Sequence, residues 1–178
     1  MEVKPTVKAY LGEIAILILS ILGSIAAPLF PQQYQWFWYA IPIALIIISF
    51  FISKRAFVLA LIALVPGAVG YYFSKYFAMV TIPIALVELY LLFKYISSIR
   101  YIIKEDGVTV SVDFIFMSST RTIPKDSISE LQVNTGPLGK ILGYADIEIK
   151  LKNKGEIKID GVPKDAADKV RKMLIGSA

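Results

Sequence analysis

Four apolar runs dominate the first half of the chain, and each ends at a polar or charged break. The breaks include Lys54-Arg55 and Ser74-Lys75, and Lys94 closes the last run. An apolar run of about 17–20 residues can cross a hydrocarbon core of roughly 30 Å as a helix. Because the connections are short, the pattern predicts an antiparallel up-down membrane bundle of four transmembrane helices over Tyr10–Leu29, Phe37–Ser53, Ala56–Phe73 and Tyr76–Phe93.

The pattern changes at the junction Lys94–Lys104, beyond which apolar and polar residues alternate. Val108–Phe116 has an apolar residue at every second position, which is the period of a half-buried strand. Pro163–Leu174 begins with proline and carries one apolar stripe, as an amphipathic helix does. No flexible linker separates the two regimes, so we expect a small folded domain held close to the membrane.

The clearest predicted hairpin is Asp146–Asp160, in which isoleucine and leucine face one way and charged residues face the other. The two faces match across the turn only if the loop has an odd number of residues. Asn153-Lys154-Gly155 fits, with Gly155 in the left-handed conformation. Lys152 would then lie opposite Glu156 as a favourable cross-strand pair.

Composition agrees with a membrane protein and excludes several kinds of chemistry. The hydrophobic fraction is 56% and the mean hydropathy is +0.64, both high for a soluble protein. The formal net charge of +5 is not concentrated in one patch, so we expect no nucleic-acid partner. Without Cys or His, the chain lacks Cys and His nucleophiles, His general bases and thiolate or imidazole metal ligands. We expect no catalytic residue, no cofactor and no metal site, and therefore not an enzyme.

The distribution of basic residues predicts the orientation in the membrane. Lys4, Lys8, Lys54-Arg55, Lys94 and Arg100 fall on one side of the predicted bundle, whereas the other side has only Lys75. By the positive-inside rule, both termini are cytoplasmic in a multi-pass protein of the cell membrane. Two alternatives remain open: the first run is a cleaved signal peptide, or the shorter runs form a re-entrant pair.

Two acidic residues, Glu13 and Glu88, interrupt the apolar runs. An ionised carboxylate in hydrocarbon is costly, so each is a candidate functional residue within the membrane. The simpler interpretation is that they close the bundle near the cytoplasmic interface by pairing with Lys8, Lys54, Arg55 or Lys94. The sharper interpretation is a proton or cation site.

The order of strands followed by one terminal helix resembles that of a pleckstrin-homology-like (PH-like) domain. Short motifs make the match more specific: Ile123-Pro124, then Gly-Pro-Leu-Gly-Lys-Ile-Leu-Gly over Gly136–Gly143, then Asp160-Gly161-Val162-Pro163. Over Ile99–Leu174 the sequence resembles the bacterial PH domain of the YdbS-like kind. The resemblance implies a small α+β domain of antiparallel β-sheets, forming a partly open barrel with one C-terminal helix, beside transmembrane helices. Many members have two such helices, so four is a departure.

These patterns divide the chain into a transmembrane four-helix region at residues 1–95 and a cytoplasmic PH-like domain at residues 96–178. Two stretches of the domain are candidate contacts with the membrane or a partner. One is the strand end where consecutive apolar residues break the alternation. The other is the glycine-rich stretch, which either tucks its apolar residues under the sheet or presents them outward. The candidate residues are Phe114, Ile115, Phe116, Met117, Leu138, Lys140 and Ile141.

The sequence therefore favours a non-catalytic integral membrane protein whose cytoplasmic PH-like domain is an interaction or scaffolding module. Its partners would be membrane lipids together with another protein or further copies of the chain. One alternative is a small transporter or channel-like bundle with Glu13 and Glu88 in the pathway and the domain as regulator. Another is a module that binds anionic lipids.

Overall fold

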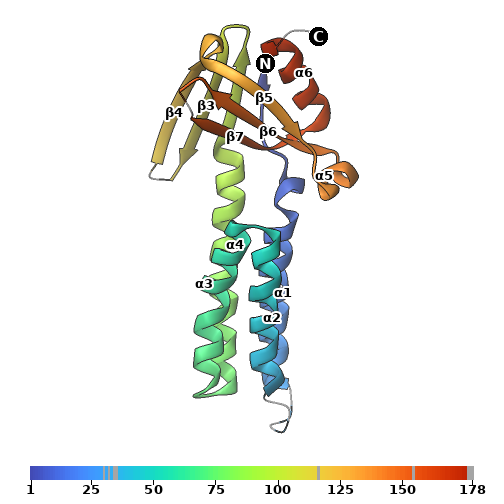
Figure 1. Cartoon of the computed structure of the whole chain (residues 1–178). Coiled ribbons are helices and arrows are strands. Elements are labelled where there is room, and N and C mark those ends of the chain that lie inside the picture. The colour runs from blue at the N-terminus through green and yellow to red at the C-terminus, as the bar shows by residue number, and fades with distance from the viewer. Residues whose placement is uncertain (30, 32, 34–35, 116, 154, 176–178) are drawn as a thin grey trace. The chain divides into compact units, whose positions relative to one another are not determined.

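A computed structural model describes residues 1–29, 31, 33, 36–115, 117–153 and 155–175. The chain divides into two compact units (Figure 1). One is Leu11–Leu92, and the other joins Met1–Tyr10 to the chain from Phe93 onward. The predicted division after residue 95 placed the first ten residues with the helices, whereas the structure places them in the other unit.

Apolar helices joined by short connections make up the first unit, as the hydrophobic runs predicted. They are α1 (Leu11–Ala26), the 3-10 turn η2 (Ala27–Leu29), α2 (Trp36–Ile52), α3 (Lys54–Tyr71), the 3-10 turn η4 (Lys75–Val80) and α4 (Thr81–Ser98). The last residues of α4 already belong to the second unit.

Helix length separates one of these apolar elements from the rest. Within the described part of the chain, three helical stretches could cross a membrane by length and composition: Val7–Ala26, Lys54–Tyr71 and Lys75–Ser98. The fourth apolar stretch, Tyr39–Ile52, is shorter. Length alone therefore supports three of the four predicted spans and leaves α2 to be decided by other evidence.

Burial in the helical unit is the reverse of that in a soluble bundle. Large apolar side chains point outward, including Leu22, Ile43 and Phe51, which are 57%, 57% and 81% exposed. Small residues such as Ala60 and Ala63 of α3 are fully buried. Every buried polar or charged side chain recorded for the described residues also lies in this unit: Glu13, Ser20, Ser24, Ser49, Thr81 and Glu88.

Small residues allow the helices to approach closely, as is usual where hydrocarbon surrounds a bundle. A Cβ atom on Gly67 of α3 would overlap the hydroxyl of Thr81, and one on Gly12 would meet the side chain of Ile52. The Ser20 hydroxyl donates to the carbonyl of Ile16 (2.7 Å), so a polar group is accommodated without a partner from another helix. The interior therefore combines small residues and internally bonded hydroxyls with a few buried large side chains such as Ile16, Leu17 and Leu64.

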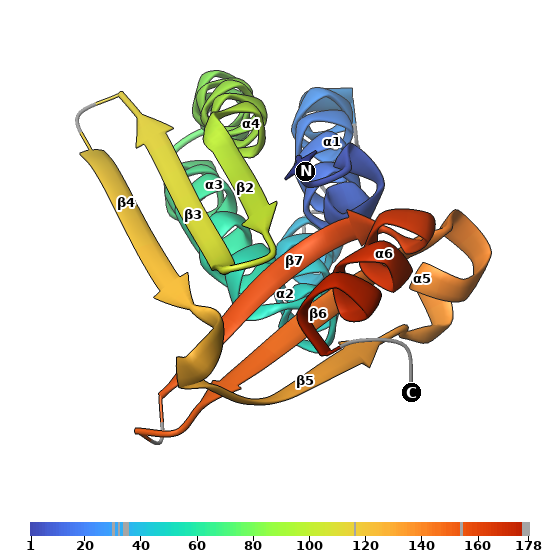
Figure 2. The same ribbon diagram turned by 90° about the horizontal axis from the view of Figure 1, so that it is seen from above.

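The second unit contains two antiparallel sheets and one covering helix (Figure 2). One sheet has the strand order β1-β2-β3-β4 and the other has the order β5-β6-β7. The elements are β1 (Glu2–Val3), the 3-10 turn η1 (Val7–Tyr10), β2 (Ile99–Lys104), β3 (Gly107–Phe114), β4 (Met117–Pro124), the 3-10 turn η5 (Lys125–Ser127), β5 (Ile128–Asn134), α5 (Pro137–Leu142), β6 (Tyr144–Leu151), β7 (Glu156–Pro163) and α6 (Lys164–Ile175).

One apolar core joins both sheets and the terminal helix. Ile103 and Val108 of the first sheet and Ile147 of the second are fully buried in it. Helix α6 lies against β5, β6 and β7 and buries Ala167 and Val170 in the same core. The predicted amphipathic stripe of the last helix is confirmed.

Two details of the predicted hairpin are wrong. Glu156 lies opposite Lys150 and not opposite Lys152. The described glycines with positive φ are Gly107, Gly143 and Gly161, so Gly155 does not supply a left-handed turn. The N–H of Leu151 instead donates to the carbonyl of Gly155 (2.8 Å) and closes a longer loop, which keeps the odd number of residues that the inward face requires.

Candidate functional site

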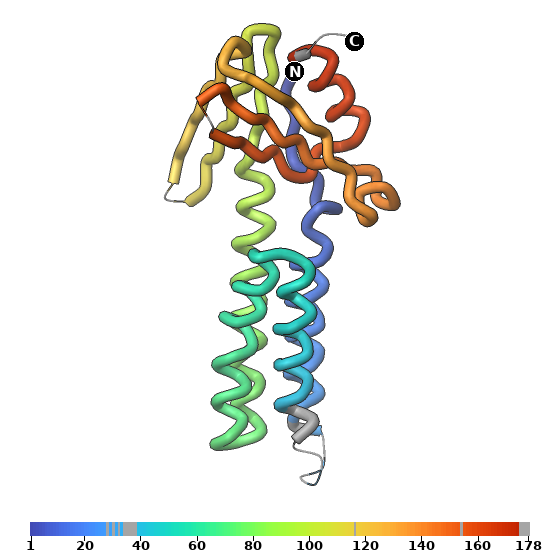
Figure 3. The backbone as a smooth tube through the Cα atoms, viewed as in Figure 1, coloured from blue at the N-terminus to red at the C-terminus, as the bar shows by residue number. Residues whose placement is uncertain are grey.

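The N-terminal strand is an integral part of the domain that follows the helices. Strand β1 pairs antiparallel with β2, with Glu2 opposite Ile102 and Val3 opposite Tyr101. The N–H of Ile103 donates to the carbonyl of Met1 (2.7 Å), and Val3 is buried in the common core. Figure 3 follows this blue segment among the strands of the domain. Segments that precede and follow the helical unit therefore belong to one folded unit.

A second contact holds the N-terminal segment at β7. The N–H of Thr6 donates to the carbonyl of Gly161 (2.7 Å). Gly161 has φ of +67°, which favours glycine, and a Cβ atom there would collide with Ala9. The N–H of Gly161 is held by the Asp146 carboxylate (2.8 Å). The Asp-Gly-Val-Pro motif noted in the sequence thus marks the place where turn η1 crosses β7.

Three tyrosines and one aspartate lie close together where the segments that lead to and from the helices join the domain. We call Tyr10, Tyr95, Tyr101 and Asp160 the junction cluster. Burial raises the pKa of the Tyr101 phenol, and Tyr10, Asp160 and Tyr95 raise it further because each opposes a phenolate charge. The N–H of Asp160 acts in the opposite direction by bonding to the phenol oxygen. Tyr10 precedes α1 and Tyr95 lies near the end of α4. The two segments that join the domain to the helices therefore meet at β2 and β7.

One lysine holds the acidic side of the junction cluster. The Lys158 ammonium lies 3.4 Å from a carboxylate oxygen of Asp146 and 3.2 Å from one of Asp160. Burial alone lowers the pKa of Lys158, but the two carboxylates outweigh this effect and leave the pKa raised. The ammonium thus stays charged at neutral pH and keeps two carboxylates together beside Gly161.

The turn between β3 and β4 places apolar side chains outside the sheet. Ile115 is 47% exposed and Met117 is 71% exposed. Ile115 has φ of +34°, an unusual conformation for a β-branched residue. The ring of Phe114 packs edge-to-face on Tyr95, with ring centroids 5.8 Å apart. Phe116, the remaining residue predicted for this surface, lies outside the described residues.

Helix α5 gives the second predicted surface. Gly139 is buried, and a Cβ atom there would collide with the carbonyl of Tyr144. The small face of α5 therefore lies on β6, while Leu138 and Ile141 face outward, 58% and 80% exposed, with Lys140 exposed beside them. Of the two predicted alternatives, the structure supports outward presentation. Helix α5 also contacts η1.

Comparison with known proteins identifies this architecture. The sequence profile of the family described as "Bacterial PH domain" matches residues 6–178. The chain belongs to the bacterial PH-domain family. No curated protein matches the sequence. A solved structure with a similar fold, "The pleckstrin homology (PH) domain of USP37", is 19% identical, covers 43% of this chain and 72% of its own, and has a TM-score of 0.33.

In the helical unit, the Glu13 carboxylate connects α1 to the start of α3. The hydroxyl of Ser53 donates to its carboxylate (2.7 Å), and the same hydroxyl accepts from the N–H of Ala56 at the start of α3 (2.9 Å). A carboxylate near a helix N-terminus is also stabilised by the helix dipole. Ser53, which sequence analysis did not single out, is therefore a partner of Glu13. Its position just before Lys54 is an ordinary N-cap signal.

Glu88 of this bacterial PH-domain protein has a different environment. It is only 7% exposed, and neither carboxylate oxygen has a hydrogen-bond partner among the described residues. Ala85, one turn before it on α4, packs with Leu17 and Ala63 in an apolar cluster. The two predicted intramembrane residues are therefore not equivalent, because Glu13 is satisfied by a hydroxyl and Glu88 is unsatisfied.

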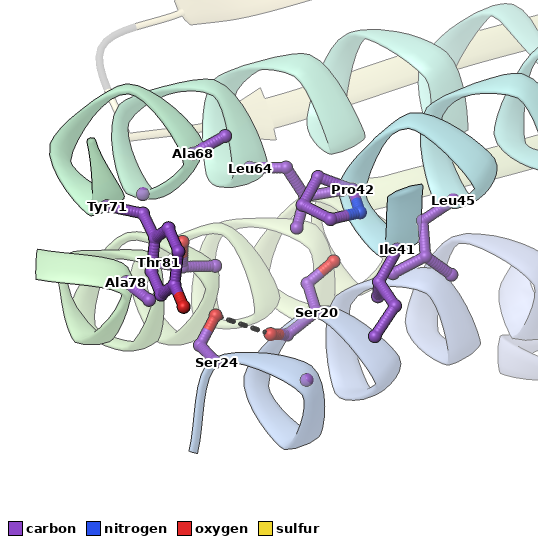
Figure 4. A pocket seen from close by; sticks show the side chains of 12 residues that line it. Ser20, Ser24, Ile41, Pro42, Leu45, Leu64, Ala68, Tyr71, Ala78 and Thr81 are labelled. Carbon is purple, nitrogen blue, oxygen red and sulfur yellow. Dashed lines mark hydrogen bonds between the residues drawn. The ribbon is translucent and has the colours of Figure 1, made fainter. Parts of the chain in front are cut away.

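The helical unit also contains a small, mostly apolar cavity with a few hydroxyl groups in its wall (Figure 4). Ser20 and Ser24 of α1 and Thr81 of α4 contribute to its lining, and Ser24 donates to the carbonyl of Ser20 (2.8 Å). Its volume of about 20 Å³ holds roughly one water molecule. Among the residues that the structure describes, no group of three or more acidic side chains could hold a metal ion.

Replacing Gly161 tests the attachment of the N-terminal segment. We expect Gly161→Ala to lower the free energy of unfolding by about 1–3 kcal/mol, because φ is positive and the new Cβ atom meets Ala9. Thermal unfolding of the full chain in detergent measures the change. Gly136→Ala is the matched control, since a Cβ atom there meets nothing within 4 Å. Equal stability of the two variants would contradict the proposed close approach.

Proposed function

We propose that this chain is a non-catalytic integral membrane protein whose PH domain is a cytoplasmic interaction module held against the membrane surface. One observation carries the proposal: the segments at both ends of the helical unit, Met1–Tyr10 and the chain from Phe93 onward, fold into one unit. A domain attached at two points has little freedom to rotate, which suits a module that presents a fixed surface.

The same observation supports four crossings of the membrane. The three longest apolar helices alone would put Tyr10 and Phe93 on opposite sides of the bilayer, although both belong to one unit. The shorter helix α2 must then cross as well. Its 17 residues span about 25 Å, somewhat less than a hydrocarbon core of roughly 30 Å. Local thinning of the bilayer accommodates such a mismatch at modest cost.

The outward-facing side chains of the helical unit support its contact with lipid. Valine, isoleucine, leucine and phenylalanine are exposed on α1, α2, α3 and α4. In water this surface would far exceed the apolar patches that monomeric proteins tolerate. The basic residues that fall on one side of the predicted bundle support a cytoplasmic PH domain, by the positive-inside rule.

Single cysteines test the four-crossing topology against a clean background, since the chain has no cysteine of its own. We expect an impermeant thiol reagent, added outside intact cells, to label Gln33→Cys and Ser74→Cys. Lys54→Cys and Lys152→Cys should be labelled only after the cells are permeabilised. Outside labelling of Lys54→Cys would show that α2 does not cross, and outside labelling of Lys152→Cys would contradict the cytoplasmic domain.

The open edge at β4 is the interaction surface that the PH domain supports best. The other sheet edges are protected: β1 has only two residues, β5 carries a register shift between Ile128 and Glu130, and β7 is crossed by η1. Strand β4 has eight residues, nearly all exposed, and pairs with β3 without a bulge. Arg121 is its one charged residue. Edges of this kind add strands from other chains.

We infer that the strand added at this edge is β4 of a second copy. An antiparallel pair with a two-fold axis at Thr120 would place Ser119 opposite Arg121, with no like charges facing each other. Hydroxyls already pair across β3 and β4, as Ser111 and Thr120 do at 3.3 Å. The exposed hydroxyls of β4 can repeat this pattern across a dimer interface.

A cysteine at the proposed two-fold axis tests the dimer. Directly opposed residues of antiparallel strands have Cα atoms about 4.5–5.5 Å apart, which suits a disulfide. We expect Thr120→Cys to form a covalent dimer in oxidised membranes. Lys169→Cys, exposed on α6, is the control and should stay monomeric. A monomeric Thr120→Cys, or equal dimer formation by both variants, would rule out this pairing.

One observation favours a second candidate, proton transport through the helical unit. An unpaired buried carboxylate such as Glu88 lowers stability, and such groups are commonly retained for function. The roughly 20 Å³ cavity argues against a continuous aqueous path. If the candidate holds, reconstituted wild-type protein and Glu13→Gln will dissipate a proton gradient and Glu88→Gln will not. Wild-type vesicles no leakier than empty ones would eliminate transport.

A further inference from the structure

We propose that the PH domain rests on the bilayer through two apolar feet, each beside one of the two points where the chain enters the membrane. The first foot is Phe114, Ile115 and Met117 at the β3–β4 turn, and the second is Leu138 and Ile141 on α5. The occupant of both is the headgroup and upper acyl region of the membrane that the helices cross. This inference rests on the proposed membrane crossing.

The first foot lies beside the end of α4. Lys94 is the first charge after the last apolar run, and Tyr95 follows at the depth where aromatic rings concentrate at the headgroups. Phe114 packs on Tyr95 with ring centroids 5.8 Å apart and the planes at 82°. Because Phe114 ends β3, this contact fixes the β3–β4 turn at the same level as Tyr95.

The second foot lies beside η1. Helix α5 contacts η1, which forms the first residues of the apolar stretch Val7–Ala26. Gly139 lets the small face of α5 lie on the backbone of β6, so Leu138 and Ile141 have to point away from the domain. Each foot therefore lies beside one of the two segments, η1 and the end of α4, that join the domain to the apolar helices.

Exposing these apolar side chains is energetically unfavourable on a surface that faces only water. A tight hairpin turn in water usually carries Asn, Asp or Gly at a positive φ, yet here Ile115 has φ of +34°. Ile141 is 80% exposed and Met117 is 71% exposed. Burying such residues at a lipid interface offsets the cost of exposing them in water.

Basic groups accompany each foot. A groove of about 320 Å³ beside the first foot is lined by Lys94, Ser97, Ser98, Arg100, Ser111 and Asp113. It offers two cations and three hydroxyls against one carboxylate. Lys140 stands between the two apolar residues of the second foot. Cations beside apolar side chains match an interface where phosphate lies above hydrocarbon.

Fluorescent labels on single cysteines of the full chain in liposomes test the two feet. We expect a label at Met117→Cys or Ile141→Cys to be quenched by spin-labelled lipids and shielded from a water-soluble quencher. Asp106→Cys is the matched control. It lies in the exposed β2–β3 turn, at the far end of β3 from the first foot, and should be quenched only from water.

A fourth position separates failure of this inference from failure of the proposed function. Leu86 is 53% exposed on α4, so Leu86→Cys should be quenched by lipid if the helices cross the membrane. If Leu86→Cys is not quenched, the membrane proposal itself fails. If Leu86→Cys is quenched but Met117→Cys or Ile141→Cys remains as open to water as Asp106→Cys, the contact through two feet is overturned.

Discussion

The pairing of β1 with β2 is the constraint on which the rest of the structure depends. Residues about a hundred positions apart share this ladder, and the whole helical unit lies between them along the chain. The contact consists only of a few backbone hydrogen bonds and the burial of Val3, but it has large consequences for the topology of the chain. It turns the helical unit into a closed loop of the domain, so the helices cannot be treated as an anchor attached at one end.

Packing in the helical unit is consistent with that closure. Small residues bring the helices together, as where Gly67 makes room for Thr81. Glu13 fixes the α2–α3 connection through Ser53, at the start of α3. Glu88 is the exception, because its carboxylate is buried without a hydrogen-bond partner among the described residues. A group that weakens the fold and serves no visible structural purpose is the feature of this unit most in need of a functional test.

Strong periodicity made much of the fold predictable. The apolar runs gave the helices, and the alternation over Val108–Phe116 and Asp146–Asp160 gave the strands of both sheets. The two-residue strand β1 could not be found in this way, because Glu2 and Val3 are too few to show a period and their partner lies far along the chain. The predicted register of the Asp146–Asp160 hairpin was wrong for a related reason. The sequence indicated a loop with an odd number of residues but did not indicate how long the loop is.

The candidate surfaces were also only partly predictable from the sequence. Consecutive apolar residues and a glycine-rich motif in the sequence indicate Ile115, Met117, Leu138 and Ile141 as candidates for an exposed apolar surface. Whether α5 buries or presents its apolar residues depends on Gly139, whose close approach to Tyr144 is a tertiary property. The junction cluster had no sequence signal, since its tyrosines are separated by the helical unit and meet only in the folded domain.

The ladder between β1 and β2 also imposes an order on biogenesis. The ribosome makes Val3 first, but its partner Tyr101 emerges only after all the apolar helices. At about 5–20 residues per second, the N-terminal strand waits several seconds for a template. If the helices cross a membrane as proposed, an odd number of crossings would put Val3 and Tyr101 on opposite sides of the bilayer, and the sheet would lack β1. Under that proposal, the β1–β2 ladder can form only when the number of crossings is even.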